Sequence, residues 1–280
     1  MIMIDYNGIA IGNIITQKLD TDENMIRHMI LNSIRMYRKK FTQQYGEVVI
    51  VSDNGGNWRK DVFPQYKFSR KKNRDDSSMD WNEVFRITNM VLDEIKENFP
   101  YKVVHQYGCE ADDAIAHIAF QTEEFGMHEP IMIVSADKDF AQLQTMKHVS
   151  QFSNMTKKFI KEDNPRHQLL SLILSGDASD GVPNVLSDDN VFVEGRRQTP
   201  LSAKKKALLM ENPHALGDDV YRNFLRNKKL IDLSQTPPSV IKDIINNFNG
   251  QDQESNKAKV FPYLVEKRCK NLIEVVQEFI

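Results

Sequence analysis

Three short apolar runs of the sequence, at residues 1–4, 48–51 and 131–134, each end close to an aspartate. The runs are rich in β-branched residues, and this composition predicts buried strands of a parallel sheet. Ligands of open α/β sheets bind beyond the carboxyl ends of the strands, so acids at these ends are expected to converge on one rim. The acids concerned are Asp5, Asp53, Asp137 and Asp139.

Two further acidic clusters lie between and after these runs. Glu110, Asp112 and Asp113 open a segment with the apolar spacing of a helix, and Asp177 and Asp180 stand in the turn-rich stretch Gly-Asp-Ala-Ser-Asp-Gly-Val-Pro. Any one of these acids taken alone is better explained as a helix-terminal or turn residue. Five acidic clusters in one chain, three of them at strand ends, favour a common site instead.

Nine carboxylates on one rim repel one another, and divalent cations relieve that repulsion. Oxygen ligands without histidine or cysteine select hard ions, so the sequence predicts two Mg²⁺ ions, with Mn²⁺ able to replace them. Removing these nine acids from the count of 39 leaves 30 acids against 37 lysines and arginines, a net charge of +7 for the rest of the chain. An acidic metal pocket on a basic molecule suits a phosphodiester substrate, attacked in line by water between ions about 4 Å apart.

The formal net charge of −2 conceals two basic segments. Residues 59–74 carry seven lysines and arginines against one acid, and residues 196–206 carry five against none. A basic run is usually a solvated face. Beside an acidic metal site, these runs favour a second explanation, which is contact with the phosphates of a nucleic acid.

Composition excludes several classes of protein. Hydrophobic residues make up 40% and charged residues 27% of the 280 residues, as in a globular protein with a sizeable core. No apolar run approaches the roughly 18–20 residues that cross a bilayer. The two cysteines are too few for a disulfide framework, and no basic region precedes the first apolar run. We therefore exclude a secreted, membrane-spanning or disordered protein and expect a cytoplasmic one.

Strands alternate with amphipathic helices in the first half of the chain. Apolar residues recur at helical spacing over residues 26–41 and 81–95, and a weaker apolar run at 102–104 adds a fourth strand. This alternation predicts an α/β fold with a mostly parallel, doubly wound sheet, in a domain formed by residues 1–162.

Two parts of the chain fall outside that sheet. Helical patterns dominate after residue 163, among them one over residues 264–279, so residues 163–280 are predicted to form a second, helical domain. The polar and basic stretch at about residues 60–80 has no place in the sheet and is expected to order when a ligand binds.

The acidic motifs have a characteristic order along the chain. They are Asp5 at a strand end, Asp53 in Val-Ser-Asp-Asn, Glu-Ala-Asp-Asp from residue 110, Ser-Ala-Asp-Lys-Asp-Phe from residue 135 and Gly-Asp-Ala-Ser-Asp-Gly-Val-Pro from residue 176. This order resembles that of the flap endonuclease-type 5′ nucleases. The likeness is closest to the ribonuclease H, or 5′-3′ exonuclease, of T-even bacteriophages and runs nearly end to end. It implies a PIN-like sheet, a helical arch at residues 60–80 and a helical DNA-binding C-terminal part.

The resemblance also implies a role for each acid. One metal ion would be bound by Asp5, Asp53, Glu110 and Asp112. The second would be bound by Asp137, Asp139 and Asp180, while Asp113 and Asp177 would hold ions through water.

The Tyr-Lys-x-x-Arg pattern at the base of the arch gives the first basic segment a function. In such enzymes Tyr66 would stack on a nucleobase, and Lys67 and Arg70 would hold the scissile phosphate. Lys71 and Lys72 would bind the nucleic acid.

The chain departs from the family after Asn184-Val185. An insertion follows, and the Gly-Ile-Gly of the family's helix–three-turn–helix is missing, which puts the potassium site of that motif in doubt. We expect duplex binding to fall instead to Arg196, Arg197, Lys204, Lys205 and Lys206.

The resemblance implies a metal-dependent 5′-3′ nuclease that removes RNA primers and short 5′ flaps during DNA replication. Its substrates would be forked or flapped DNA and RNA–DNA duplexes, and it would act as a monomer in the bacterial cytoplasm beside replication proteins such as a single-strand-binding protein. Alternatives are a PIN-like single-strand endoribonuclease, a catalytically inactive structure-specific binding protein, and a phosphatase using Asp137 and Asp139. The preference for RNA or DNA and the length of the flap stay open.

Overall fold

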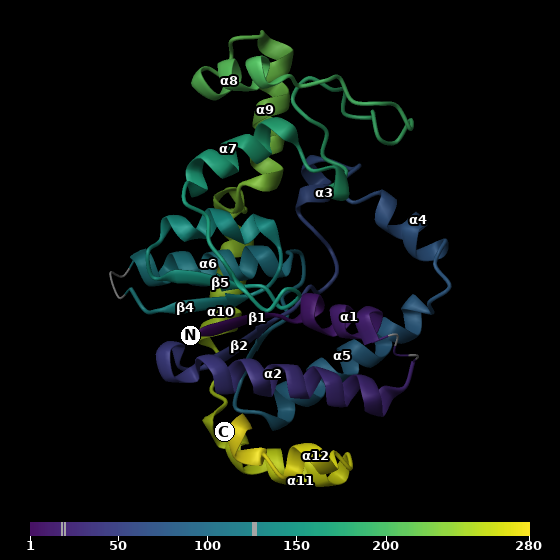
Figure 1. The fold of residues 1–280 in the computed structure, drawn as a ribbon, viewed down its shortest axis with the longest axis vertical. Helices are drawn as coiled ribbons and strands as arrows, with labels where there is room; N and C mark the ends of the chain where they lie inside the picture. Colours follow the sequence, from purple (N-terminus) through teal and green to yellow (C-terminus); the bar gives the residue numbers. More distant parts are fainter. Residues whose placement is uncertain (18, 20, 125–127) are drawn as a thin grey trace.

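The computed structural model describes the whole chain except residues 18, 20 and 125–127. Its centre is a six-stranded sheet of order β3-β2-β1-β4-β5-β6, in which only the β5–β6 pair is antiparallel (Figure 1). The strands are β1 (Ile2–Asp5), β2 (Val48–Val51), β3 (Lys102–Val104), β4 (Ile131–Val134), β5 (Val149–Phe152) and β6 (Phe159–Ile160). The predicted mostly parallel, doubly wound sheet is confirmed. Since β2 and β4 both pair with β1, their carboxyl ends are neighbours at the point where the strand order reverses.

The sequence predicts four of these strands and misses β5 and β6. β5 reads Val-Ser-Gln-Phe, so polar residues interrupt the apolar run that identifies a buried strand, and β6 has only two residues. Gln151 is 1% exposed, and its amide donates to the backbone carbonyls of Ser135 (3.1 Å) and Asp137 (2.7 Å). Gln151, which interrupts the apolar pattern of β5, therefore supports the loop after β4.

Alternation along the strands divides the core into two layers. On β1, Ile2 and Ile4 belong to one buried cluster and Met3 to the other. The first cluster is covered by α1 (Tyr6–Gln17), α2 (Glu23–Tyr45) and α5 (Trp81–Asn98), and the second by α6 (Ala111–Glu124) and α10 (Pro238–Asn249). The predicted helices at 26–41 and 81–95 are confirmed as α2 and α5.

The expected arch contains two short helices, α3 (Arg59–Val62) and α4 (Ser69–Asp75). It leads from α3 to α5, with α4 passing at a distance from the sheet (Figure 1). Asp80 caps α5 by accepting a hydrogen bond from the Glu83 backbone N–H at 3.1 Å. Lys71 and Lys72 fall within α4, but their side chains lie outside the described part of the structure.

Three helices after residue 163 stand together at one end of the molecule (Figure 1). They are α7 (Pro165–Ser175), α8 (Ala203–Glu211) and α9 (Asp218–Ile231). α7 packs on both α8 and α9, around small clusters that include Leu174, Val185 and Leu209. The departing segment 184–202 contains turns and no helix between η2 (Ala178–Asp180) and α8.

The remaining C-terminal helices return to the sheet domain. α11 (Val260–Glu266) and α12 (Lys270–Ile273) contribute Leu264 and Leu272 to the same buried cluster as α2 and α5. The single helical pattern expected over 264–279 is wrong, because α11 ends at Glu266 and Arg268 adopts a left-handed φ of 54°. Residues from both sides of the predicted 162/163 boundary therefore share the two large buried clusters.

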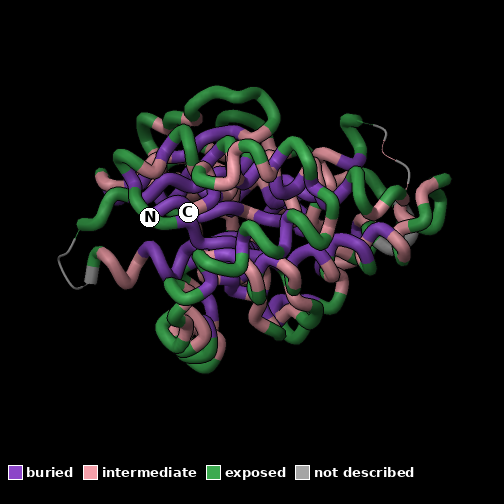
Figure 2. The backbone as a smooth tube through the Cα atoms, turned by 90° about the horizontal axis from the view of Figure 1, so that it is seen from below, coloured by how far each residue is buried: buried purple, intermediate pink, exposed green. Residues whose placement is uncertain are grey.

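Buried backbone fills the centre of the molecule, and exposed segments form its rim (Figure 2). Within the residues that the structure describes, no helix is both long and apolar enough to cross a bilayer.

Candidate active site

Asp5 ends the central strand, and its carboxylate is held on two sides. The Ser135 hydroxyl after β4 donates to Oδ2 at 2.7 Å, and the Gly8 N–H donates to Oδ1 at 3.1 Å. A Cβ at position 8 would lie 2.7 Å from Asp5 Oδ2, so any larger residue there would displace the carboxylate. Burial, reinforced by the charges of Asp53 and Asp137, raises the pKa of Asp5 to about 6.

Asp53 links the end of β2 to the start of α6. Its Oδ1 accepts a hydrogen bond from the Ala111 N–H at 2.7 Å, and its Oδ2 accepts one from the Asn7 amide at 3.2 Å. The side chain keeps one face open to solvent, yet loss of hydration and the neighbouring Glu110 raise its pKa. The strand-end positions inferred from the sequence thus place Asp5 and Asp53 in one electrostatic cluster.

Glu110 is the carboxylate around which the base of the arch is arranged. Lys67 forms an ion pair with its Oε1, and the Tyr66 hydroxyl lies 2.9 Å from its Oε2. Arg59 Nη1 lies 3.5 Å from the same Oε2. Burial by itself would raise the pKa of Glu110. The charges of Lys67 and Arg59 outweigh this effect, so the pKa lies below its usual range.

One part of the cluster has the least of its negative charge neutralised by neighbouring cations. It contains Asp112, Asp137 and Asp139. Burial, with repulsion from Asp137, Glu110 and Asp5, raises the pKa of Asp112 well above its usual range. Burial, with repulsion from Asp137 and Asp177, raises that of Asp139 to about 7. Asp139 Oδ1 is buried, and no described residue donates a hydrogen bond to it. A buried carboxylate oxygen without a partner, facing other acids, has the chemistry of a cation ligand.

The turn at residues 176–182 brings Asp177 and Asp180 to the same place. Gly176 and Gly181 make this turn possible, since a Cβ on Gly176 would lie 2.4 Å from the Val182 carbonyl oxygen and both glycines have positive φ. Lys138 Nζ lies 2.8 Å from Asp177 Oδ2, and Arg70 donates to Asp180 Oδ1 at 2.7 Å. The Lys67 backbone N–H donates to the Asp180 carbonyl at 2.8 Å, which ties the arch to the turn.

A polar cavity of about 290 Å³ lies within this acidic cluster. Its charged lining comprises Lys67, Arg70, Asp112, Asp137, Lys138, Asp139, Asp177 and Asp180. Asp5, Asp53 and Glu110 belong to the same charge cluster through their interactions with Asp112, Asp137 and each other. The structure thus brings together eight of the nine carboxylates that the sequence singles out.

Asp113 is the exception, because groups of the protein itself bind its carboxylate. Its side chain is fully buried, and both oxygens accept hydrogen bonds from Arg59, at 2.7 Å and 2.9 Å. Trp58, Thr236 and the Glu110 backbone N–H also donate to it. The ion pair with Arg59 overcomes burial and holds the pKa of Asp113 below its usual range. Protein donors thus occupy both oxygens of Asp113 in this structure.

Tyr66 is buried at the base of the arch. The ring is 4% exposed and packs in a cluster with Phe63, Val182 and Leu230. It offers no free face on which a nucleobase could stack in this conformation. Its hydroxyl lies between Glu110 Oε2 and Asp180 Oδ2, at 2.9 Å and 3.0 Å, so Tyr66 positions two carboxylates.

The second basic segment lies apart from this cavity. Arg197, Lys204 and Lys205 are exposed on the loop before α8 and on α8 itself. Arg196 pairs with Asp188 and Glu194, and Lys206 donates to the Ser175 hydroxyl at 2.7 Å. The exposed side chains of Arg197, Lys204 and Lys205 are therefore available to a partner of opposite charge.

Several positioning residues give no signal in the sequence. Gln151, Asn7 and Ser135 are neutral groups whose hydrogen bonds to the strand-end loops form only in the folded chain. Lys138 was detectable, since it stands between two aspartates in Asp-Lys-Asp, and Arg59 belongs to the first basic segment.

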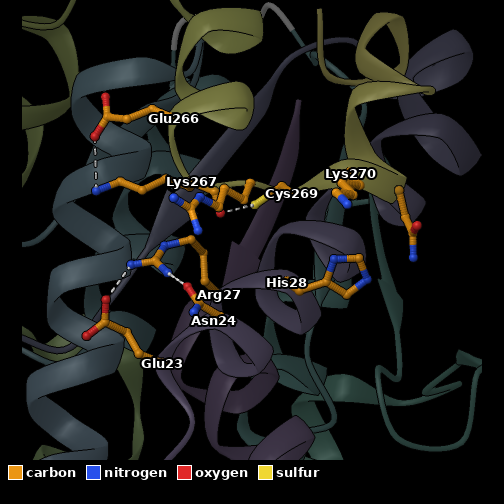
Figure 3. Close-up of a pocket in the computed structure, with 10 residues that line it drawn as sticks. Glu23, Asn24, Arg27, His28, Glu266, Lys267, Cys269 and Lys270 are labelled. Atoms are coloured by element: carbon orange, nitrogen blue, oxygen red, sulfur yellow. Dashed lines mark hydrogen bonds and ion pairs between the residues drawn. The ribbon is translucent and has the colours of Figure 1, made fainter.

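Another cavity, of about 610 Å³, lies between α2 and the segment 266–271 (Figure 3). Its charges are largely paired: Arg27 binds Glu23 and Glu94, and Lys267 binds Glu94 and Glu266. This network fastens the C-terminal helices to α2 and lies outside the acidic cluster.

Comparison with known proteins places this arrangement in a family. Residues 2–171 match the family model described as 5'-3' exonuclease, N-terminal resolvase-like domain, and residues 164–279 match that of T4 RNase H, C terminal. The ribonuclease H of Enterobacteria phage T4 is 32% identical, over 99% of this chain and 95% of that protein. A 5'-3' exonuclease of Buchnera aphidicola is 30% identical, over 69% of this chain and 61% of that protein.

A solved structure agrees at the level of the fold. The T5 5'-exonuclease with bound zinc ions has a TM-score of 0.62 at 18% identity, covering 95% of this chain and 99% of that one. The fold is thus shared over nearly the whole length. With both family models matched, the chain belongs to the 5'-3' exonuclease family of nucleases, in the group that carries the C-terminal part of the T4-type ribonuclease H.

Proposed function

We propose that this nuclease uses two Mg²⁺ ions to hydrolyse phosphodiesters near the 5′ end of a strand, removing RNA primers and short flaps. The observation that carries the proposal is the convergence of strand-end carboxylates around the unpartnered, buried Asp139 Oδ1, with Lys67 and Arg70 at the same cavity. Oxygen ligands alone favour Mg²⁺ or Mn²⁺ over softer ions.

The donor set divides between two ions. Asp5, Asp53, Glu110 and Asp112 are proposed for one, and Asp137, Asp139 and Asp180 for the other, with Asp177 outside them through water. Bound ions would supply a nucleophilic hydroxide and stabilise the leaving oxygen. Asp113 is left out of the proposed set, because Arg59 occupies both of its oxygens.

Lys67 and Arg70 are proposed to bind the scissile phosphate. In this structure they pair with Glu110 and Asp180, and both cations line the acidic cavity. Lys67 has a left-handed φ of 55°, a conformation uncommon for a residue with a side chain. Such a backbone, fixed by the hydrogen bond to the Asp180 carbonyl, preorganises the ammonium group for a developing negative charge.

A neighbouring cavity of about 600 Å³ supports a single-stranded 5′ end as substrate. It runs between α1, α4 and α5, and its wall includes Asp53 and Arg70 of the acidic site. The rest is largely apolar and aromatic, including Ile15, Trp81 and Phe85. Arg74 lies over the Phe85 ring at 5.7 Å. Aromatic rings combined with arginines suit unpaired bases.

The exposed cations of the loop before α8 and of α8 are proposed to hold the duplex beside the flap. The side chains concerned are exposed and can contact phosphates at a distance from the cleavage site. They are Arg197, Lys204 and Lys205. Action as a monomer, and cooperation with a single-strand-binding protein, stay predictions of the sequence.

The test compares Asp137→Asn with Asp163→Asn on forked duplexes whose 5′ strand is RNA or DNA and carries an end label. Asp137 stands at the acidic rim, whereas Asp163 is exposed and pairs with Lys161. We expect Mg²⁺-dependent short 5′ products from wild type and Asp163→Asn. Asp137→Asn should lose cleavage at least a hundredfold while its affinity for the fork changes only a few-fold.

Cleavage by Asp137→Asn at a near wild-type rate would overturn the two-metal assignment. Binding without cleavage by the wild type would favour the inactive binding protein. Internal cuts in single-stranded RNA, independent of a fork, would favour the endoribonuclease.

A further inference from the structure

A second group of metal-ligand side chains lies at the opposite edge of the sheet. Glu123 is near the end of α6, His128 precedes β4, and His148 immediately precedes β5. These positions are at the amino ends of β4 and β5, whereas the acidic site lies at the carboxyl ends. The group is therefore separated from the acidic site by the length of the strands, roughly 13 Å for four residues.

The three side chains converge on a small volume. Each offers one ligand atom, and the three atoms lie within 4.8 Å of one another. Glu123 Oε2 is 3.4 Å from His148 Nδ1 and 3.6 Å from His128 Nδ1. The two imidazole rings meet edge to face, with centroids 5.5 Å apart.

The tautomer of His148 is fixed by a hydrogen-bond chain. The Thr122 hydroxyl donates its single proton to the Ala119 carbonyl at 2.7 Å. It can therefore only accept at its contact with His148 Nε2, at 3.0 Å, which puts a proton on Nε2. In a neutral ring that proton leaves Nδ1 as a lone pair facing the Glu123 carboxylate.

The Glu123 carboxylate and the Nδ1 lone pair of His148 are both acceptors. Because they face each other, a cation must lie between them, either a proton or a metal ion. His148 is 9% exposed and held by Thr122, so its lone pair is preset, while Glu123 and His128, at 49% and 62%, are free to adjust. A ligand histidine whose other ring nitrogen is hydrogen-bonded is the usual arrangement at metal sites.

We propose that Glu123, His128 and His148 form a site for Zn²⁺, both histidines coordinating through Nδ1. Two imidazoles and one carboxylate select a borderline transition metal, in contrast to the all-oxygen acidic site. Three protein ligands leave a fourth position for water. The ion would join the end of α6 to the start of β5 and so stabilise this edge of the sheet.

The test titrates Zn²⁺ into the full-length, metal-stripped protein by calorimetry in an excess of Mg²⁺, which occupies the all-oxygen site. We expect one Zn²⁺ per chain and a rise in melting temperature. His128→Gln and Glu123→Gln should abolish this binding, and His167→Gln, an exposed histidine elsewhere, should retain it. Thr122→Val should weaken it about tenfold or more, since it removes the group that orients His148.

A spectroscopic readout separates coordination from a structural defect. Histidine ¹H–¹⁵N long-range spectra should show the Nε2–H tautomer for His148 and a Zn²⁺-dependent shift of Nδ1 in both rings. Asp137→Asn should bind Zn²⁺ as wild type does, which separates this proposal from that of the acidic site. Unchanged one-site binding by His128→Gln, or no binding by wild type in Mg²⁺, would overturn it.

Discussion

The Arg59 guanidinium and the Asp113 carboxylate form a buried, two-pronged ion pair, with N–O distances of 2.7 Å and 2.9 Å. Arg59 begins the arch, and Asp113 lies in the first turn of α6 beside Glu110. The pair therefore fixes the arch to the acidic site. Arg59 also donates to the Leu230 carbonyl at 2.8 Å, so one guanidinium connects the arch, α6 and α9.

Replacing Asp113 by Asn should destabilise the protein by about 3–5 kcal/mol, because Arg59 would keep a buried charge without its partner. Urea unfolding in EDTA measures the loss, and Asp163→Asn is the matched surface control. A variant of unchanged stability that has lost metal affinity would return Asp113 to the metal ligands.

The metal-free protein should lose stability as the pH rises from about 4 to about 7. Asp139 has a native pKa of about 7. A raised native pKa means that the folded state binds more protons than the unfolded state in this window, so the free energy of unfolding falls with rising pH. Asp139→Asn cannot deprotonate and should melt above wild type at pH 8 in EDTA. The two melting temperatures should approach each other at pH 4, and parallel pH profiles would contradict this assignment.

Tyr66→Phe should keep the stability of the fold but slow cleavage. The ring stays packed with Phe63 and Val182, while the hydroxyl between Glu110 and Asp180 is lost. Tyr66→Leu should in addition destabilise the fold, since it removes part of a buried ring. Single-turnover rates and thermal melts measure the two effects. A large loss of affinity for single strands in Tyr66→Leu that Tyr66→Phe does not share, with the rate of Tyr66→Phe unchanged, would argue for stacking on a base, because phenylalanine keeps the ring.

Lys67→Ala and Arg70→Ala should slow the chemical step about 10²–10³-fold, as expected when a charge aimed at the transition state is removed. Lys204→Ala and Lys205→Ala, on the exposed face of α8, should instead weaken binding and leave the single-turnover rate at saturation unchanged. Equal, purely binding-level losses in all four variants would remove Lys67 and Arg70 from the active site.

Affinity for forked duplex should fall steeply with salt, because each phosphate contact releases counterions. Combining Lys204→Ala with Lys205→Ala should reduce the slope of log affinity against log salt by up to about two. Binding measured in Ca²⁺ at several salt concentrations gives this slope. A salt-independent dissociation constant would contradict the role of the basic surface.

The sequence alone determined four of the six strands and most of the acidic rim. Four apolar runs identified β1 to β4, and parallel strands bring their carboxyl ends to one edge, so Asp5, Asp53 and Asp137 had to be neighbours. β5 could not be predicted from the apolar pattern, because the polar Gln151 interrupts it. Gln151 is nevertheless buried, since it forms hydrogen bonds to the loop that it supports. Local pattern does not report such long-range pairing.

Only the tertiary structure decided which acids are free. Asp112 and Asp113 are adjacent and chemically identical in the sequence, yet α6 points them in different directions. Asp113 meets Arg59, brought close by the fold from 54 residues away, and Asp112 meets other carboxylates. Whether a carboxylate is neutralised by a cation or left for a metal depends on contacts between distant parts of the chain, and these contacts exist only after folding.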